Sequence, residues 1–204
     1  MLKRSALYMI TALFLASNVL AGVANAANNG VTNEVKTTVD EVVRIVSDKE
    51  MKRSDQKRRQ ALKKAISTIF DYNEMAKRSL GKHWNQRSAT EKKQFAELFA
   101  SLLENSYAGK IESYNNERIV YLKETIDGVY AEVKSKVVTS KRDEFNLDYR
   151  MINQNGKWMV YDVIIEGVSL VSNYRTQFNK IITADGYPVL VKKLQTKTDE
   201  LKAP

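Results

Sequence analysis

The sequence contains no cysteine and only one histidine, His83. Without cysteine the chain has no thiol nucleophile, no thiolate metal ligand and no disulfide bond. A metal site would therefore depend almost entirely on carboxylates, and the acidic residues do not follow the spacing of a calcium-binding loop. We accordingly expect no metal and no cofactor.

Proline and glycine are also scarce, with two and eight residues in a chain of 204. No internal repeat and no low-complexity linker is present. Because domain boundaries usually coincide with flexible linkers, this composition predicts one compact domain with short connections.

The one long apolar stretch lies at the N-terminus. Lys3 and Arg4 precede an uncharged and largely apolar segment, residues 5–23, which the small residues of Ala24-Asn25-Ala26 follow. This order is typical of a secretory signal peptide cleaved after Ala26. The alternative is an uncleaved membrane anchor, which the polar residues inside the segment disfavour. We therefore expect a signal peptide at 1–26 and a single exported domain at 27–204.

The chain is basic, with a net charge of +9 at neutral pH. Removal of Lys3 and Arg4 with the signal peptide leaves 31 basic and 24 acidic residues, a net charge of +7. In an exported protein such a balance favours an anionic membrane surface or an acidic protein as partner, rather than nucleic acid. The charges are spread along the chain, so a solvated surface accounts for most of them.

Apolar residues recur at helical spacing in six segments, which are residues 31–48, 53–70, 71–81, 88–114, 169–186 and 188–201. Between the fourth and fifth segments the period changes to two, in residues 118–122, 129–138, 145–151 and 157–165. The turns Asp127-Gly128 and Asn155-Gly156 are typical of hairpins. Asp71 and Ser88, each followed three residues later by glutamate, are predicted to cap the helices that follow them, Ser88 in a capping box with Glu91. The sequence thus predicts an α+β fold, in which N-terminal helices, an antiparallel sheet of about four strands and two C-terminal helices pack together, with helices on one concave face of the sheet.

A two-residue turn at Asn155-Gly156 also predicts which residues of the last two strands share a face. The expected inward set consists of Phe145, Leu147, Tyr149, Met151, Trp158, Val160, Asp162 and Ile164. Burying the Asp162 carboxylate without a partner would cost several kcal/mol. It must therefore accept hydrogen bonds, either from Tyr149 or from a helix N-terminus.

The stretch Gly167-Val-Ser-Leu-Val171 has the outline of the strand-turn-helix motif that presents a catalytic serine. Two parts of that motif are missing, because Val171 replaces the second glycine and His83 lies upstream of Ser169 instead of downstream. A lipid hydrolase with Ser169 as nucleophile is therefore the weaker hypothesis. A role of Ser169 as the cap of the following helix is the stronger one.

Two long stretches resemble signatures of the MlaC family, also called the toluene-tolerance or ABC-transporter auxiliary family. Residues 70–107 resemble the first signature, with Phe-Asp, Met-Ala and Leu-Gly-x-x-Trp in order. Residues 156–182 resemble the second, Gly-x-Trp-x-Val-Tyr-Asp-Val-x-x-Glu-Gly-Val-Ser-Leu-x-x-Asn-Tyr-Arg-x-x-Phe. The likeness covers nearly the whole domain.

This resemblance implies a monomeric periplasmic phospholipid carrier that uses no cofactor, since the phospholipid is its cargo. It also implies exchange with an inner-membrane ABC transporter complex that has an MCE-domain component, and with an outer-membrane lipoprotein complex, which would maintain outer-membrane lipid asymmetry. A hopanoid or another lipid as cargo, and an envelope interaction module with a solid core, remain alternatives. The residues cannot by themselves distinguish a solid core from a lipid-filled one.

If a lipid cavity exists between helices and sheet, the predicted faces and the turn before the fifth helical segment supply its candidate wall residues. These are Leu103, Tyr107, Ile111, Val133, Leu147, Tyr149, Val160, Ile164, Val168, Val171 and Tyr174. We expect Val171→Trp to block lipid loading and to leave the fold intact if Val171 lines such a cavity.

Overall fold

The computed structural model describes residues 30–202 of the chain. The predicted signal peptide and its cleavage after Ala26 lie outside the described residues. Within the described part, no helix combines the length and the apolar character needed to cross a bilayer.

The order of elements agrees with the predicted α+β class. Four N-terminal α-helices come first, α1 (Val31–Ser47), α2 (Lys49–Lys52), α3 (Asp55–Ser67) and α4 (Tyr72–Leu80). The short 3-10 helix η1 (Gly81–Gln86) and the long helix α5 (Ala89–Glu112) follow. The strands are β1 (Arg118–Asp127), β2 (Tyr130–Val138), β3 (Glu144–Gln154), β4 (Lys157–Ile165) and β5 (Val168–Ser169), and α6 (Leu170–Asp185) and α7 (Tyr187–Lys202) complete the chain.

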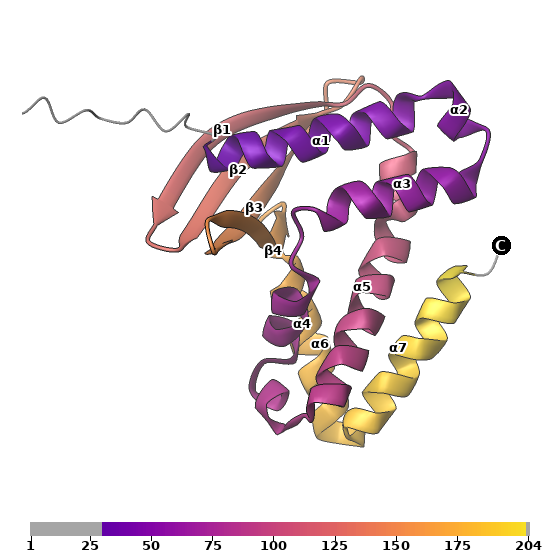
Figure 1. Ribbon diagram of the computed structural model, residues 1–204, viewed down its shortest axis with the longest axis vertical. Coiled ribbons are helices and arrows are strands. Elements are labelled where there is room, and N and C mark those ends of the chain that lie inside the picture. The colour runs from indigo at the N-terminus through magenta and orange to yellow at the C-terminus, as the bar shows by residue number, and fades with distance from the viewer. Residues whose placement is uncertain (1–29, 203–204) are drawn as a thin grey trace, which may run out of the picture.

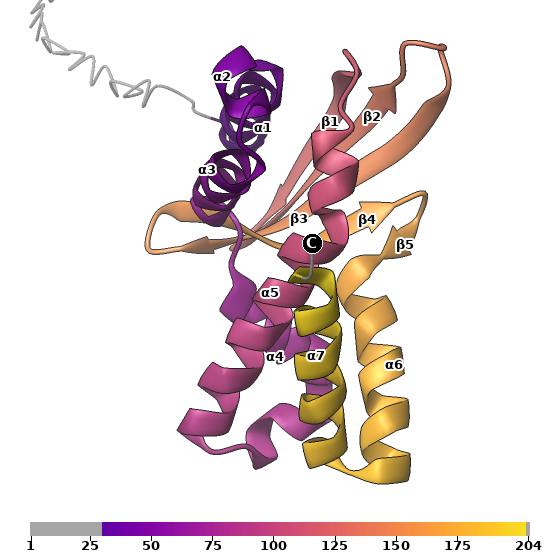
Figure 2. The same cartoon turned by 90° about the vertical axis from the view of Figure 1, so that its right-hand side faces the viewer.

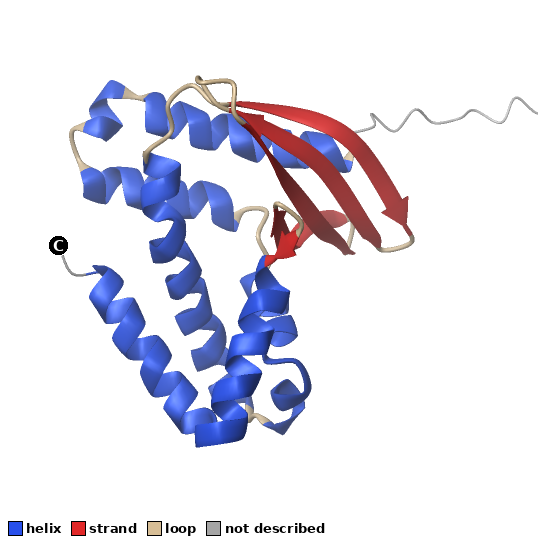
Figure 3. Cartoon of the chain, turned by 180° about the vertical axis from the view of Figure 1, so that it is seen from behind, coloured by secondary structure: helices blue, strands red, loops and turns tan. Residues whose placement is uncertain are grey.

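The strands form one antiparallel sheet in the order β1-β2-β3-β4-β5. The helices form two groups around it (Figures 1 and 2). Helices α4, α5, α6 and α7 make a bundle beyond one end of the sheet, and the α1–α3 hairpin lies across one face of it. Helix α5 belongs to both regions, because it begins in the bundle and ends beside the sheet. Figure 3 shows from behind that the bundle leaves much of the opposite face of the sheet uncovered.

The helix boundaries follow from the capping residues. Ser88 accepts a hydrogen bond from the Glu91 amide, and the Glu91 carboxylate accepts one from the Ser88 amide, which together form the predicted capping box of α5. Asp71 caps α4 by accepting from the Glu74 amide, with an N–O distance of 2.9 Å. The predictions for both caps are confirmed.

The bundle has a densely packed aromatic core. Phe95 and Phe99 of α5 meet Phe178 of α6 edge to face, with ring centroids 5.7 and 5.6 Å apart. The Phe95, Phe99 and Phe178 side chains are at most 3% exposed. Aromatic pairs in this geometry stabilise a core beyond the area that they bury.

A β-bulge at Tyr161 makes the predicted faces of β4 wrong in part. The register runs as expected from the turn to the pair Met151–Val160, but the next pair is Arg150–Asp162, so that Tyr161 has no partner on β3. One extra residue reverses the alternation beyond it. Val163 therefore joins Tyr149 on the inner face, and Asp162 turns to the other side of the sheet.

The bulge directs the buried carboxylate of Asp162 to the start of α6. Its Oδ1 accepts from the Val171 amide at 3.0 Å, and its Oδ2 accepts from the Ser169 hydroxyl at 2.6 Å. Ser169 in turn accepts from the Ser172 amide at 3.0 Å and caps the helix. Of the two partners expected for Asp162, Tyr149 or a helix N-terminus, the structure shows the helix N-terminus, and the prediction that Ser169 is a cap is confirmed.

Replacement of Asp162 by alanine should therefore lower the free energy of unfolding by about 2–3 kcal/mol, because the buried Val171 amide would lose its acceptor. Ser169→Ala should cost about 1 kcal/mol, the usual loss for an N-cap hydroxyl. Urea unfolding followed by circular dichroism measures both. Equal stability of Asp162→Ala and the natural chain would refute this role of the carboxylate.

Candidate functional site

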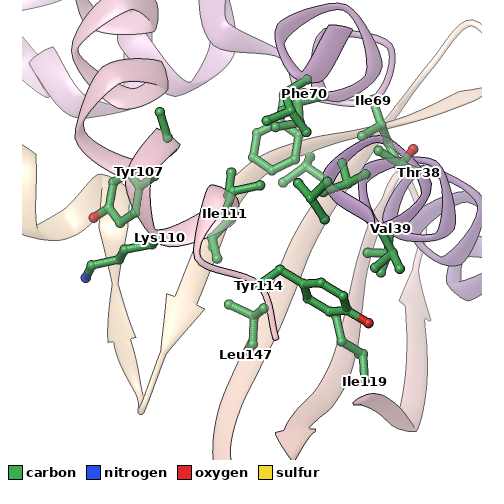
Figure 4. Close-up of a pocket in the computed structure, with 18 of the residues that line it drawn as sticks. Thr38, Val39, Ile69, Phe70, Tyr107, Lys110, Ile111, Tyr114, Ile119 and Leu147 are labelled. Carbon is green, nitrogen blue, oxygen red and sulfur yellow. The ribbon is translucent and has the colours of Figure 1, made fainter. Parts of the chain in front are cut away.

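A cavity of about 1180 Å³ lies between the α1–α3 hairpin, the second half of α5 and the inner face of the sheet (Figure 4). This volume exceeds the roughly 300–1,000 Å³ of most small-molecule sites. The space exists because α5 and the α1–α3 hairpin both lie beside the inner face of the sheet but do not pack closely on each other.

The cavity wall is made mainly of apolar side chains from every neighbouring element. Helices α1 and α3 contribute valine, leucine and isoleucine, α5 contributes leucine, isoleucine and tyrosine, and strands β1 to β4 supply the floor. The apolar residues on it include Val35, Val39, Val42, Leu62, Ile66, Leu103, Tyr107, Ile111, Ile119, Tyr121, Val137, Phe145, Leu147, Tyr149, Val160 and Val163. Such a wall favours a long apolar ligand over a polar metabolite.

Three tyrosines on this wall, Tyr72, Tyr121 and Tyr149, stay uncharged at neutral pH. Burial and the nearby Asp40 carboxylate raise the pKa of Tyr121 to about 12. Burial also raises the pKa of Tyr149, as do the neighbouring Tyr121 and Asp148. Burial and Glu104 raise the pKa of Tyr72. These three side chains therefore add no phenolate charge to the cavity.

Four of the charged side chains on the wall pair with one another. Lys63 of α3 bonds to Glu104 of α5 at 3.0 Å, and Lys36 pairs with Asp40 within α1. The Lys110 ammonium lies 5.6 Å from the centre of the Tyr107 ring. Among residues 30–202, no group of three or more acidic or histidine side chains could hold a metal ion.

Six of the eleven candidate wall residues line the cavity. These are Leu103, Tyr107 and Ile111 on α5, and Leu147, Tyr149 and Val160 on the sheet. Several of them are drawn in Figure 4. Sequence periodicity identified them because each lies on an apolar stripe that faces the gap between helix and sheet.

The other five candidates do not line the cavity. Val133 is fully buried between α1 and the sheet, and Val168 is 59% exposed. Val171 and Tyr174 pack in the bundle, where the Tyr174 ring lies 5.2 Å from that of Phe99. Ile164 lies beyond the bulge and turns with Asp162 to the other side of the sheet.

The missed wall residues include all those of α1 and α3. Their apolar stripes, such as Val35, Val39 and Val42, were visible in the sequence. Periodicity shows only that such a stripe is buried, and it does not show whether it faces a solid core or an empty space.

Comparison with known proteins places this architecture in a family. The sequence model of the MlaC protein family matches residues 36–196, which include all the strands and nearly all of the cavity wall. The chain belongs to the MlaC family. The resemblance seen in the two signature stretches is thereby confirmed.

Two curated relatives in the MlaC family match part of the chain. They are the intermembrane phospholipid transport system binding protein MlaC of Haemophilus influenzae, 26% identical over 59% of this chain, and the toluene tolerance protein ttg2D of Pseudomonas putida, 27% identical over 62%. The matched segments span 59% and 60% of the two relatives' own lengths.

A solved structure extends the MlaC-family comparison to the whole fold. The phospholipid-binding protein of Ralstonia solanacearum, determined in complex with a phospholipid, is 28% identical to this chain. Its TM-score is 0.76, and the alignment covers 84% of this chain and 98% of that one.

The candidate serine of this MlaC-family chain has no neighbouring imidazole. The Ser169 hydroxyl donates to Asp162, whereas His83 Nε2 lies 2.9 Å from the Asn179 side-chain oxygen. The capping hydrogen bonds thus account for Ser169, and the position of His83 gives the hydrolase hypothesis no support.

The position of Val171 also changes the expected effect of a tryptophan there. Val171→Trp should lower the free energy of unfolding by about 1–3 kcal/mol, because it overpacks the bundle core. Leu147→Trp should cost less than about 1 kcal/mol, since the half-buried Leu147 faces the cavity and the larger ring has space to enter. Urea unfolding compares the two, and an equal loss for both would contradict the assignment of Leu147 to the cavity wall.

Proposed function

We propose that this protein is a phospholipid carrier of the periplasm and holds the acyl chains of its cargo in the cavity. The observation that carries the proposal is an apolar cavity of about 1180 Å³ in a chain of the MlaC family. The solved relative from R. solanacearum, which has the same fold, was determined in complex with a phospholipid.

The physical argument rests on the transfer of acyl chains out of water. Each CH₂ group that moves from water into the cavity contributes about 0.8 kcal/mol to the free energy of binding. The many CH₂ groups of a long acyl chain therefore contribute far more than one side-chain contact does. A phospholipid monomer needs such shielding to cross an aqueous compartment. Leu103, Tyr107, Ile111, Leu147, Tyr149 and Val160 are the predicted residues that would contact it.

The proposed partners follow from the family and from the name of the H. influenzae relative, which refers to an intermembrane phospholipid transport system. In this proposal the carrier protein is a monomer. It exchanges phospholipid with an inner-membrane ABC transporter complex that has an MCE-domain component, and with an outer-membrane lipoprotein complex. This exchange would maintain outer-membrane lipid asymmetry. The carrier performs no chemistry and needs no cofactor, because the transporter would supply the energy.

Protein purified from a bacterial host should carry phospholipid, which native mass spectrometry detects as an added mass that delipidation removes. Delipidated protein should then take up phospholipid from liposomes of phosphatidylethanolamine and phosphatidylglycerol. Empty protein in both experiments would contradict the proposal. A bound hopanoid in place of phospholipid would identify a different cargo in the same cavity.

Leu147→Trp should lower this uptake at least several-fold, because the indole occupies space that the acyl chains need. Val168→Trp is the matched control, since Val168 is exposed and lies away from the cavity wall. Equal loss of uptake in both variants would show that the cavity does not hold the lipid.

A further inference from the structure

The α1–α3 hairpin is attached to the sheet at its two ends. At the start of α1, the Thr32 amide and hydroxyl donate to Glu124 Oε2 of β1 at 2.7 and 2.6 Å, and Val31 and Val35 are buried against the sheet. After α3, the backbone of Ile69 accepts from the Val160 amide at 2.7 Å. Both ends are therefore fixed to strands.

The tip of the hairpin, by contrast, has little apolar attachment. Helix α2 contains no buried residue. Helix α3 packs on α1 and not closely on α5, although the cavity lies between them. Near the tip, Ile111 of α5 and Tyr114, just after that helix, pack against the small cluster of Ile45, Val46, Leu62 and Ala65.

Long charged side chains bridge the seam between α3 and α5. Lys63 pairs with Glu104 at 3.0 Å, Arg59 with Glu112 at 3.2 Å, and Arg58 with the same Glu112 oxygen at 3.5 Å. The Glu104 and Glu112 side chains are only 17% and 13% exposed. Lys63, Arg59 and Glu104 also line the cavity, so that these ion pairs form part of its wall.

The seam borders the cavity over several turns of both helices. Wall residues of α3 extend from Arg59 to Ile66, and those of α5 extend from Ser101 to Ile111. A rotation of the hairpin about its two attached ends would separate α3 from α5 and leave the sheet intact. An elongated ligand could then leave sideways, without sliding past the whole apolar wall.

We propose that the cargo enters and leaves through the α3–α5 seam, and that Glu104 and Glu112 control its opening through their ion pairs with α3. This inference rests on the proposed carrier function. The competing route is axial exit past Asn116 and Thr139, which also line the cavity, with the seam closed. Salt should favour opening of the seam, because it screens partly exposed ion pairs.

Cross-linking across the seam tests the route directly, since the natural chain has no cysteine. The double variant Lys63→Cys/Glu104→Cys is joined by a bis-maleimide that contains a reducible disulfide. The protein is loaded with phosphatidylethanolamine carrying a fluorescent acyl chain, and release into liposomes of phosphatidylethanolamine and phosphatidylglycerol is recorded. Release should slow at least tenfold and recover after reduction.

The control for this test is Gln195→Cys/Asp199→Cys, joined in the same way on α7. Gln195 and Asp199 are exposed neighbours that hydrogen-bond to each other and lie away from the seam. Unchanged release from the protein joined across the seam would overturn the proposed route in favour of axial exit. If no variant takes up lipid at all, the carrier function itself fails, which is a different result.

The charge test uses Glu104→Gln and Glu112→Gln, with Glu200→Gln as control because Glu200 pairs with Lys197 on the exposed face of α7. Each seam variant should release lipid roughly fivefold faster at low salt, because it loses an ion pair whose free energy lies at the upper end of the range for surface pairs.

The double variant Glu104→Gln/Glu112→Gln should lose the salt dependence of release. The reversed pair Lys63→Glu/Glu104→Lys should restore slow release, and equal rates in all variants would overturn the role of the two glutamates.

Discussion

The structure must keep a large apolar cavity open between the sheet and its helices. Facing apolar surfaces normally close on each other, because empty space forfeits packing contacts. The α4–α7 bundle makes the open space possible. Its core of Phe95, Phe99 and Phe178 packs as a solid unit, so that stability does not depend on filling the cavity.

One joint between the sheet and the α4–α7 bundle is the distorted strand β4. The bulge at Tyr161 lets β4 present Val160 and Val163 to the inner face and Asp162 to the start of α6. The residues between α3 and α4 also bond to β4 here, through the Asp71 amide and the Val160 carbonyl at 2.9 Å. Helices α4 and α6 thus begin beside the same few residues of the sheet, whereas the part of the hairpin near α2 meets side chains at the end of α5.

Local rules predicted the elements and their ends well. The capping residues Asp71, Ser88 and Ser169 act within one helical turn, and their partners are close in sequence. The bulge was not predictable in this way, because nothing in Val-Tyr-Asp-Val indicates an unpaired residue. The error propagated to Ile164, which was assigned to the wrong face together with Asp162.

The candidate site was predictable only in part, for a physical reason. Leu147 and Val171 each lie on an apolar stripe, one in a strand and the other in a helix, yet Leu147 faces the cavity and Val171 lies in the bundle core. Periodicity reports that a side chain avoids water, and it does not report what covers the side chain. Likewise, the pairing of Lys63 with Glu104 joins helices far apart in the chain, so that spacing could not reveal it.

The most direct test of the central claim is to map where the acyl chain lies in the loaded protein. Phosphatidylethanolamine with a photoreactive group at the end of one acyl chain is bound and irradiated, and the modified residues are identified by mass spectrometry. The account predicts modification of cavity residues such as Leu103, Ile111 and Leu147. Modification confined to the bundle, at Val171 or Tyr174, or to the exposed surface would contradict it.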